Sequence, residues 1–382
     1  MLSWLIPKNF ICGLLFAGIL KSFNTSSVLH ARLLYIILSL FLAIVSLFIK
    51  LFAHDAYSKF GFLMPICPDY TCFTSYIIHA IMLSLSIFHF CILALTLSVN
   101  SIAFACYQKC WVLKFILYFA ILIGCIWFTN ILDYYSWIAF GFIIGFIGIQ
   151  SIYLIEFNYD WSEAWFEYYN ESSSKYWATM LIIFSIISWI FNVGMLIITY
   201  FISKHFWVSL LNFVVSVSIT IFSSSSLCQN GSLLSSSLTM AFATYFLTTA
   251  FLINPKDKNY LIIFLDIFLS LISLCYLAFV QPEKHKTNSH SEFKHSKIAN
   301  FSQKNQEDDF ESKEKSKPNT ILFQITLASY CFYLGMILTD WELALNDNRH
   351  FTAKCLQAML IMSFYLWTLI APLLFPDREF SR

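Results

Sequence analysis

Four carboxylates in the segment from Glu156 to Trp177 recur at a spacing that could bind a cation. On a helix these acids share one face, and three aromatic side chains fall on the adjoining faces. The acids are Glu156, Asp160, Glu163 and Glu167, and the aromatic residues are Trp161, Trp165 and Tyr168. Carboxylates attract an ammonium group, and burial beside aromatic rings strengthens that attraction. The pattern therefore predicts either a site for an amine or a cation, or a solvated acidic face beside an aromatic belt.

A second polar segment, from Ser223 to Ser237, is rich in hydroxyl groups, which continue through Thr239 into an apolar stretch. Hydroxyls in helices commonly bond the carbonyl one turn back, which would make them structural. The alternative is that Ser236, Ser237 and Thr239 line a polar groove that faces lipid. Such a groove would lower the cost of moving a charged group through hydrocarbon. Both interpretations stay open at this point.

Asp266 lies inside another apolar stretch, Tyr260–Val280. An ionised carboxylate in lipid is costly, and such a residue is by default a candidate for function. Its nearness to Lys256 and Lys258 also allows a position at the membrane interface.

The cysteines and the enzyme motifs limit the possible chemistry. Cys67 and Cys72 follow the first long apolar stretch closely enough to form a disulfide, and two free thiols are the alternative. The 11 cysteines lack the paired spacing of a zinc site. The sequence contains no Gly-x-Ser-x-Gly elbow, no His-Glu-x-x-His helix, no phosphate-binding glycine loop and no dinucleotide fingerprint. We therefore expect no metal, no cofactor and no enzymatic activity.

The composition indicates which solvent surrounds these residues. Of 382 residues, 59% are hydrophobic and 12% are charged, whereas a soluble domain is about 25% charged. A soluble core of this size could not enclose 41 Phe, 20 Tyr and 11 Trp, so lipid must surround much of the chain. The net charge of +1 provides no basic field, which excludes nucleic acid as a partner.

Ten apolar stretches approach or exceed the roughly 20 residues that a helix needs to cross a bilayer. They are Leu33–Phe52, Ile77–Cys106, Trp111–Phe128, Trp137–Phe157, Tyr176–Phe201, Phe206–Phe222, Ser236–Ile253, Tyr260–Val280, Thr320–Leu338 and Cys355–Phe375. Backbone polar groups must be satisfied within the segment when lipid surrounds it. We therefore expect an all-α integral membrane protein with about ten transmembrane helices.

The fourth of these spans continues into the acidic and aromatic segment. From Trp137 to Asn170 a helix would measure about 50 Å at about 1.5 Å per residue, which exceeds the roughly 30 Å of a hydrocarbon core. A long fourth helix must therefore tilt strongly or project into the headgroup region.

The charged segment 281–319 interrupts the apolar pattern, and its composition cannot bury enough apolar area to fold alone. We expect a membrane region over residues 1–280 with spans one to eight, a disordered charged cytosolic loop over 281–319, and a membrane region over 320–382 with spans nine and ten. An even number of spans places both termini on one side. That side holds more of the Lys and Arg residues and is expected to be cytosolic. The apolar segment Phe10–Leu20 is expected to be a retained interfacial or half-buried segment rather than a signal peptide.

Five segments, taken in order, resemble the serine incorporator, or Serinc, family of multi-pass membrane proteins. The strongest is SFYLWTLIAPLLFPDREF, Ser363 to Phe380, which looks like the family's ending of Tyr-Leu-Trp-Thr-Leu-Val-Ala-Pro followed by Asn-Arg-Asp-Phe. LTDWE, Leu338 to Glu342, is similar to the family's Leu-Thr-Asn-Trp. CWVLKF, from Cys110, and SSSLTMAFATY, from Ser235, look like two further family segments.

The fifth match falls on the acidic and aromatic segment. Glu156-Phe157 followed by Trp161, Glu163 and Trp165 resembles the family's Asp-Phe-Ala-His-Ser-Trp-Asn-Glu-x-Trp. The chain departs from the family where Tyr159 and Asp160 replace the His-Ser pair. Its N-terminus also holds only Cys12 where the family is rich in cysteine.

The resemblance implies a ten-helix fold crossed by a long diagonal fourth helix, and a role with membrane lipids. That role is support of serine incorporation into phosphatidylserine and sphingolipids, passive phospholipid scrambling, or both. In that picture Glu156, Trp161, Glu163 and Trp165 shape the mouth of a headgroup groove, and Arg378 meets phosphate. Membrane phospholipids, serine lipids among them, are the expected partners, in the plasma membrane or an endomembrane. The alternatives are a transporter of serine or another small solute, and a membrane scaffold.

Overall fold

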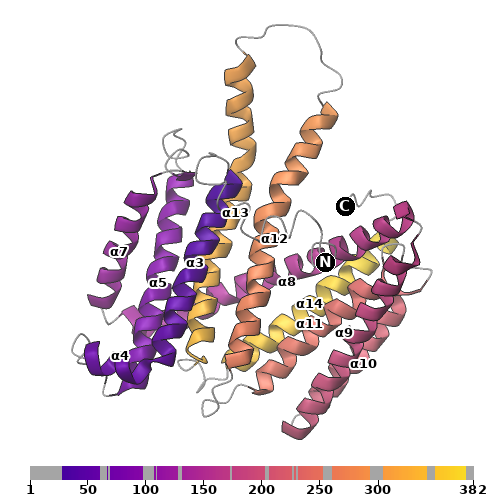
Figure 1. Ribbon diagram of the computed structural model, residues 1–382, viewed down its shortest axis with the longest axis horizontal. Coiled ribbons are helices and arrows are strands. Elements are labelled where there is room, and N and C mark those ends of the chain that lie inside the picture. Colours follow the sequence, from indigo (N-terminus) through magenta and orange to yellow (C-terminus); the bar gives the residue numbers. More distant parts are fainter. Residues whose placement is uncertain are drawn as a thin grey trace. The chain divides into compact units, whose positions relative to one another are not determined.

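The computed structural model describes residues 28–60, 67, 69–97, 107–108, 110–127, 131–172, 174–202, 206–225, 228, 231–252, 260–292, 304–341 and 349–375. All regular structure in these ranges is helical (Figure 1). The helices are α3 (Val28–Leu51), α4 (Ala53–Phe60), α5 (Tyr70–Leu97), α7 (Trp111–Trp127), α8 (Ile131–Ser172), α9 (Lys175–Ile202), α10 (Phe206–Ser223), α11 (Leu233–Leu252), α12 (Tyr260–Glu292), α13 (Lys304–Leu338) and α14 (Arg349–Leu374).

Each of the ten predicted spans coincides with one of these helices. Within the described ranges, nine helices are long and apolar enough to cross a membrane, and α7 is a shorter apolar helix of 17 residues. A helix satisfies its own backbone hydrogen bonds, which is why long apolar segments fold this way in lipid. The predicted all-α, multi-pass membrane architecture is confirmed.

The helices pack into two units, each made of segments that are distant in sequence. We call them the α5–α13 unit, formed by the described residues of 28–146 and 267–341, and the α11–α14 unit, formed by the described residues of 147–266 and 349–375. Two helices contribute to both units, since α8 divides after Phe146 and α12 divides after Asp266. The two units are described separately below.

In the α5–α13 unit, α13 packs along α5, and α3 and α7 pack against α5 as well (Figure 1). Aromatic rings fill the interior, with Phe142 stacked on Phe332 at a centroid distance of 4.9 Å. Gly335 of α13 allows a close approach, because a Cβ at this position would lie only 2.5 Å from the Tyr135 hydroxyl. The packing thus depends on a missing side chain at one helix crossing.

The C-terminus of α13 ends in two residues with left-handed backbone. Asp340 and Trp341 have φ values of 52° and 58°. The Asp340 amide donates to Ile337 O at 3.1 Å and the Trp341 amide to Met336 O at 2.7 Å, which is the bonding pattern of a Schellman motif. Lys50 Nζ of α3 donates to Asp340 Oδ2 at 2.6 Å and fixes the turn to a second helix.

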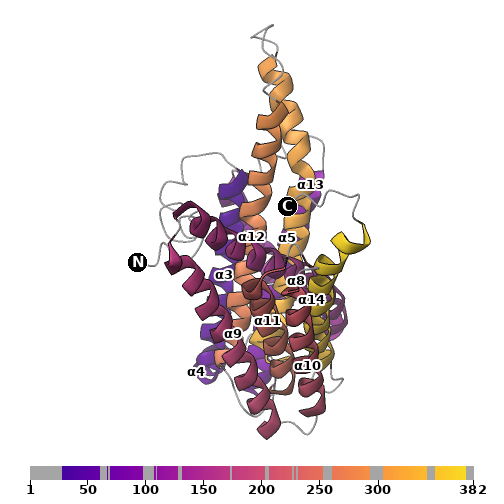
Figure 2. The same cartoon turned by 90° about the vertical axis from the view of Figure 1, so that its right-hand side faces the viewer.

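In the α11–α14 unit, α11 packs between α9 and α14, and α10 contacts all three. Figure 1 and Figure 2 both show these four helices side by side. α11 is largely buried, while α9 and α10 expose most of their apolar side chains. The polar residues of α11 therefore face protein on most sides.

Two findings concern the long elements. α8 has 42 residues, or about 63 Å, which confirms the long fourth helix. The segment 281–319 was expected to be a loop, but α12 continues to Glu292 and α13 begins at Lys304. A span that is already helical provides the nucleus, and the Lys and Glu residues beyond it are good helix formers. Residues 293–303 lie outside the described ranges, as does the segment Phe10–Leu20.

Candidate functional site

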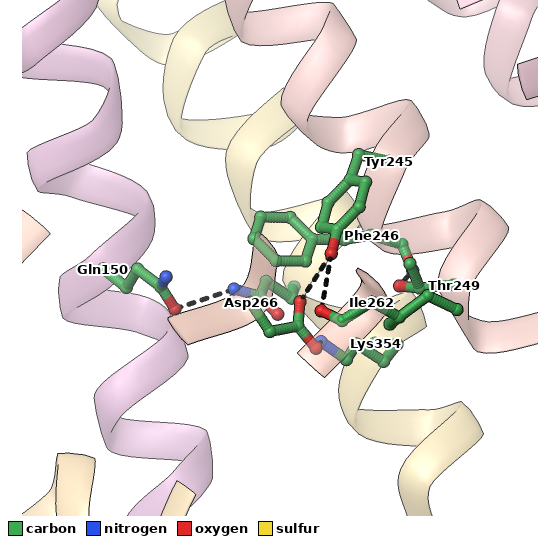
Figure 3. A network of polar contacts seen from close by, with 8 residues as sticks. Gln150, Tyr245, Phe246, Thr249, Ile262, Asp266 and Lys354 are labelled. Atoms are coloured by element: carbon green, nitrogen blue, oxygen red, sulfur yellow. Dashed lines mark hydrogen bonds and ion pairs between the residues drawn. The ribbon is translucent and has the colours of Figure 1, made fainter. Parts of the chain in front are cut away.

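A buried ion pair joins α12 to α14 inside the α11–α14 unit. Lys354 Nζ lies 2.7 Å from Asp266 Oδ2, and the two side chains are 1% and 2% exposed. The Tyr245 hydroxyl donates to Asp266 Oδ1 at 3.1 Å, and the Lys354 ammonium lies 5.1 Å from the centre of the Phe246 ring (Figure 3). A buried charge requires a partner and further hydrogen bonds, and this carboxylate has both.

An amide pair lies one helical turn from this ion pair. Gln357 Nε2 of α14 donates to Gln150 Oε1 of α8 at 2.9 Å (Figure 3). Both side chains are fully buried. Within the described part of the chain, Gln357 Oε1 accepts no hydrogen bond. The site therefore keeps one buried acceptor available close to a buried cation.

Further polar pairs connect α11 to its neighbours along its length. They are Ser162–Ser232 at 2.7 Å, Asn158–Thr239 at 2.9 Å, Asn212–Thr244 at 3.2 Å and Thr199–Thr248 at 3.5 Å. Together with Tyr245, Asp266 and Lys354, we call these pairs the polar column. Its residues come from α8, α9, α10, α11, α12 and α14 and from the residue before α11. The column thus lies in the interior that these helices share. Its hydroxyl and amide groups can each both donate and accept hydrogen bonds.

α14 contributes two hydroxyl contacts near the start of α11. The Tyr365 hydroxyl lies 3.1 Å from Ser223 Oγ and 3.5 Å from Ser235 Oγ. Thr368 Oγ1 lies 2.9 Å from the hydroxyl of Tyr159, which belongs to α8. These contacts extend the polar column toward the N-terminus of α11.

The three residues proposed for a polar groove lie in this interior. Ser236, Ser237 and Thr239 are fully buried, and each hydroxyl donates to a carbonyl three or four residues back, at 3.1, 3.0 and 2.7 Å. Thr239 also accepts the hydrogen bond from Asn158 and so belongs to the polar column. Through this bond, Thr239 of α11 is joined to Asn158 of α8.

The acidic and aromatic residues of α8 point to different sides of the helix. Trp165 is 1% exposed and packs on Trp161, Trp177 and Phe184, at centroid distances of 5.4, 6.2 and 5.2 Å. Phe184 and Trp177 belong to α9, so the tryptophans hold α8 to α9.

The carboxylates lie away from this contact. Glu156 is half-buried, whereas Asp160, Glu163 and Glu167 are exposed. We call these four residues the acidic face of α8. Helical spacing predicted this division, and the structure follows it.

Two other predicted site residues lie elsewhere. A disulfide joins Cys67 to Cys72 at the start of α5, in the α5–α13 unit. Arg378 lies outside the described ranges. Among the described residues, no cluster of three or more His, Cys, Asp or Glu side chains could hold a metal ion.

Four further residues complete the site and were not predicted from the sequence: Lys354, Tyr245, Gln150 and Gln357. Gln150 carried a signal, since it is a polar residue within the apolar stretch Trp137–Phe157. Lys354 directly precedes the apolar stretch Cys355–Phe375, a position that is typical of a residue flanking a span. The sequence alone did not pair either residue with a partner.

Comparisons with known proteins bear on the family of this chain. A probable serine incorporator of Monosiga brevicollis is 21% identical over an alignment of 379 positions, gaps included, that covers 79% of this chain and 78% of that protein. The sequence profile of the serine incorporator (Serinc) family matches residues 8–378. Because this match covers nearly the whole chain, the protein belongs to the serine incorporator family.

Proposed function

We propose that this protein moves phospholipid headgroups passively between the leaflets of its membrane and thereby supports serine incorporation into phosphatidylserine and sphingolipids. The proposal includes no chemical step on the lipid. It places the protein in the plasma membrane or an endomembrane, with both termini cytosolic and with membrane phospholipids, serine lipids among them, as its partners.

The observation that supports this function most is the polar column of the α11–α14 unit. Apolar helices in lipid do not need a polar interior to associate, since packing of small and apolar residues suffices. Buried hydroxyls, amides and an ion pair are costly in that setting and mark functional regions of membrane proteins. A headgroup that exchanges bonds with these side chains would avoid most of the cost of entering hydrocarbon.

The acidic face of α8 provides the second part of the proposal. Its residues Glu156 and Glu163 would attract the amine of a headgroup at the entrance to the site. Trp161 and Trp165 hold this stretch of α8 to α9 and fix where the carboxylates stand. Arg378 is proposed to meet the phosphate of the same lipid.

The test is a scrambling assay in liposomes that contain the purified full chain and no ATP. Fluorescent phosphatidylserine and phosphatidylcholine are placed in both leaflets, and dithionite quenches the outer leaflet. Quenching beyond the outer-leaflet fraction supports the proposal. Quenching equal to that of empty liposomes, with protein shown to be monodisperse and inserted, refutes it.

Variants connect the activity to the acidic face. Glu156→Gln combined with Glu163→Gln should slow scrambling, because the amides no longer attract an ammonium group. Asp55→Asn is the matched control, since Asp55 is an exposed carboxylate of α4 in the other unit. Equal rates for a folded double variant and the control would remove Glu156 and Glu163 from the proposal.

One observation favours solute transport as a second candidate. The pair of Asp266 and Lys354 presents both charges of a zwitterion within membrane-spanning helices, and intramembrane charges often mark substrate pathways. The same liposomes, loaded with a serine gradient and no fluorescent lipid, test it. Serine uptake without scrambling would support the transporter and refute the lipid function.

A further inference from the structure

Asn158 of α8 keeps one hydrogen-bonding atom unused inside the α11–α14 unit. Its side chain is 1% exposed, and its amide nitrogen donates to Thr239 Oγ1 of α11 at 2.9 Å. Asn158 Oδ1 is also buried, and it accepts no hydrogen bond from any residue that the structure describes. A buried oxygen without a donor is costly, so a ligand that brings a donor to it would be stabilised.

The chemistry of Thr239 fixes which atom of this amide is left over. The Thr239 hydroxyl has a single proton, which it donates to Ser235 O at 2.7 Å. Toward Asn158 the hydroxyl can therefore only accept, so the amide must turn its NH2 group to it. The unused atom is thus an oxygen, which accepts hydrogen bonds and cannot donate them.

A chain of hydroxyl groups begins one helical turn away, at Ser162 of α8. The Oγ atoms of Ser162 and Ser232 lie 2.7 Å apart, and those of Ser232 and Ser235 lie 2.9 Å apart. Ser235 Oγ lies 3.5 Å from the Tyr365 hydroxyl of α14. We call these four residues the hydroxyl chain. Each hydroxyl can donate or accept, so the chain can offer further acceptors to a ligand that carries N–H donors.

The charge of α8 favours a cation as that donor. This helix contains Asp and Glu residues but no Lys, Arg or His. Glu156 lies two residues before Asn158, and Glu163 lies five residues after it. A negative potential attracts a charged donor more than a neutral one, and a hydrogen bond from an ionised donor is roughly twice as strong. An ammonium group is therefore the donor that suits this stretch of α8.

Asn158 would distinguish two classes of ammonium group. The primary ammonium of an ethanolamine or serine headgroup carries N–H bonds, whereas the quaternary ammonium of choline carries only methyl groups. In the same position, a choline group would leave Asn158 Oδ1 buried without a hydrogen bond. A site that hydrogen-bonds one substrate rejects an analogue without the matching group, because the buried polar atom is then unpaired.

We propose that Asn158 Oδ1 and the hydroxyl chain form a binding site for a primary ammonium group and discriminate against choline. The ammonium group is supplied by the headgroup of an aminophospholipid or by free serine. The inference rests on the proposed function, since it names the class of headgroup that enters the polar column. Binding is measured without transport, so the two proposals can fail separately.

The test measures binding to the purified full chain in phosphatidylcholine nanodiscs. One series contains a small fraction of phosphatidylethanolamine with the same acyl chains, a second contains free serine in the buffer, and a third contains neither. Native mass spectrometry counts retained lipid, and thermal unfolding reports stabilisation by either ligand. Stabilisation by phosphatidylethanolamine alone assigns the lipid headgroup, and stabilisation by serine as well assigns any primary ammonium group. Stabilisation by neither overturns the proposal.

Variants locate the binding at Asn158. Asn158→Leu removes the acceptor and should weaken binding of phosphatidylethanolamine about tenfold, the effect of losing one charge-assisted hydrogen bond. Asn158→Asp keeps an acceptor oxygen and should bind this lipid at least as tightly as the wild type. Asn192→Leu is the matched control, because Asn192 is fully buried in α9 and its amide donates to Ser188 O of its own helix at 2.9 Å.

Several results for folded variants overturn the proposal. They are equal affinity in the wild type and Asn158→Leu, an equal loss in Asn192→Leu, and a loss in Asn158→Asp. If Asn158→Leu does not fold, the measurement on Asn158→Asp remains decisive, because an asparagine with a purely structural role would be damaged by either change.

The scrambling assay separates this inference from the proposed function. With labels on the acyl chains, phosphatidylethanolamine should move faster than phosphatidylcholine in the wild type, and the two should move equally in Asn158→Leu. Selective binding without any scrambling refutes the proposed function and leaves the ammonium site. Scrambling of both lipids at one rate, without selective binding, refutes the ammonium site and leaves the proposed function.

Discussion

Lys354 Nζ lies 2.7 Å from Asp266 Oδ2, although 88 residues separate the two along the chain. Removing either charge leaves the other buried and uncompensated. Lys354→Met or Asp266→Asn should therefore lower the free energy of unfolding by about 3–5 kcal/mol. The double variant Asp266→Leu with Lys354→Met should lose much less, since no charge remains buried. Unfolding in mixed micelles with increasing SDS measures each value.

The pair of Lys50 and Asp340 is the comparison for that experiment. Its ammonium and carboxylate also lie close, at 2.6 Å, but Asp340 is 28% exposed. Lys50→Met should cost about 1 kcal/mol, because solvent screens the remaining carboxylate. A loss as large as that of Lys354→Met would show that burial does not govern the difference.

Gly335 and Tyr135 allow a test of close helix packing. Gly335→Ala places a Cβ 2.5 Å from the Tyr135 hydroxyl and should destabilise the protein by about 1–3 kcal/mol. Tyr135→Phe removes that hydroxyl, so the double variant should recover part of the loss. Gly124→Ala is the control, since its Cβ would meet no atom within 4 Å. The prediction fails if both glycine variants unfold at the same SDS fraction.

Trp165 and Trp161 should differ in how much they stabilise the contact between α8 and α9. Trp165 is 1% exposed and touches two rings of α9, whereas Trp161 is half-buried. Trp165→Ala should cost about 3–5 kcal/mol, and Trp161→Ala should cost less. The same unfolding assay ranks them, and the reverse order would contradict this account of the contact.

The expected orientation can be tested at Cys110, an exposed free cysteine at the start of α7. If both termini are cytosolic, this residue is cytosolic as well. A membrane-impermeant maleimide should then label it only after the cells are permeabilised. Cys110→Ser identifies its share of the signal. Labelling of Cys110 in intact cells would reverse the orientation.

The sequence predicted the helices well because the bilayer imposes a simple rule. A span needs about 20 apolar residues and satisfies its own hydrogen bonds, so composition alone locates it. The same rule explains why the ends of some helices were not predicted. A helix such as α12 does not stop where its apolar residues stop, and it continues through the charged residues to Glu292.

The partners inside the bundle were harder to predict. Asp266 was recognised as a costly residue, but nothing in the sequence pointed to Lys354, because pairing depends on which helices are neighbours. The hydroxyls of α11 posed a similar problem. Polar and apolar residues of α11 alternate around all sides of the helix, so it has no distinct polar face. Nothing in this pattern indicated that Ser236, Ser237 and Thr239 would be buried.

The polar column also affects how the chain inserts into the membrane during synthesis. Of the nine candidate spans in the described ranges, α11 has the lowest mean hydropathy, and a segment of this kind partitions weakly from the translocon into lipid by itself. α9 and α10 are synthesised before it and can shelter it, but α14, which covers another of its sides, is synthesised last. Until α14 has been synthesised, the hydroxyls of α11 lack one of the helices that cover them in the finished protein. Chains that stall or end before α14 should therefore be prime substrates for membrane quality control.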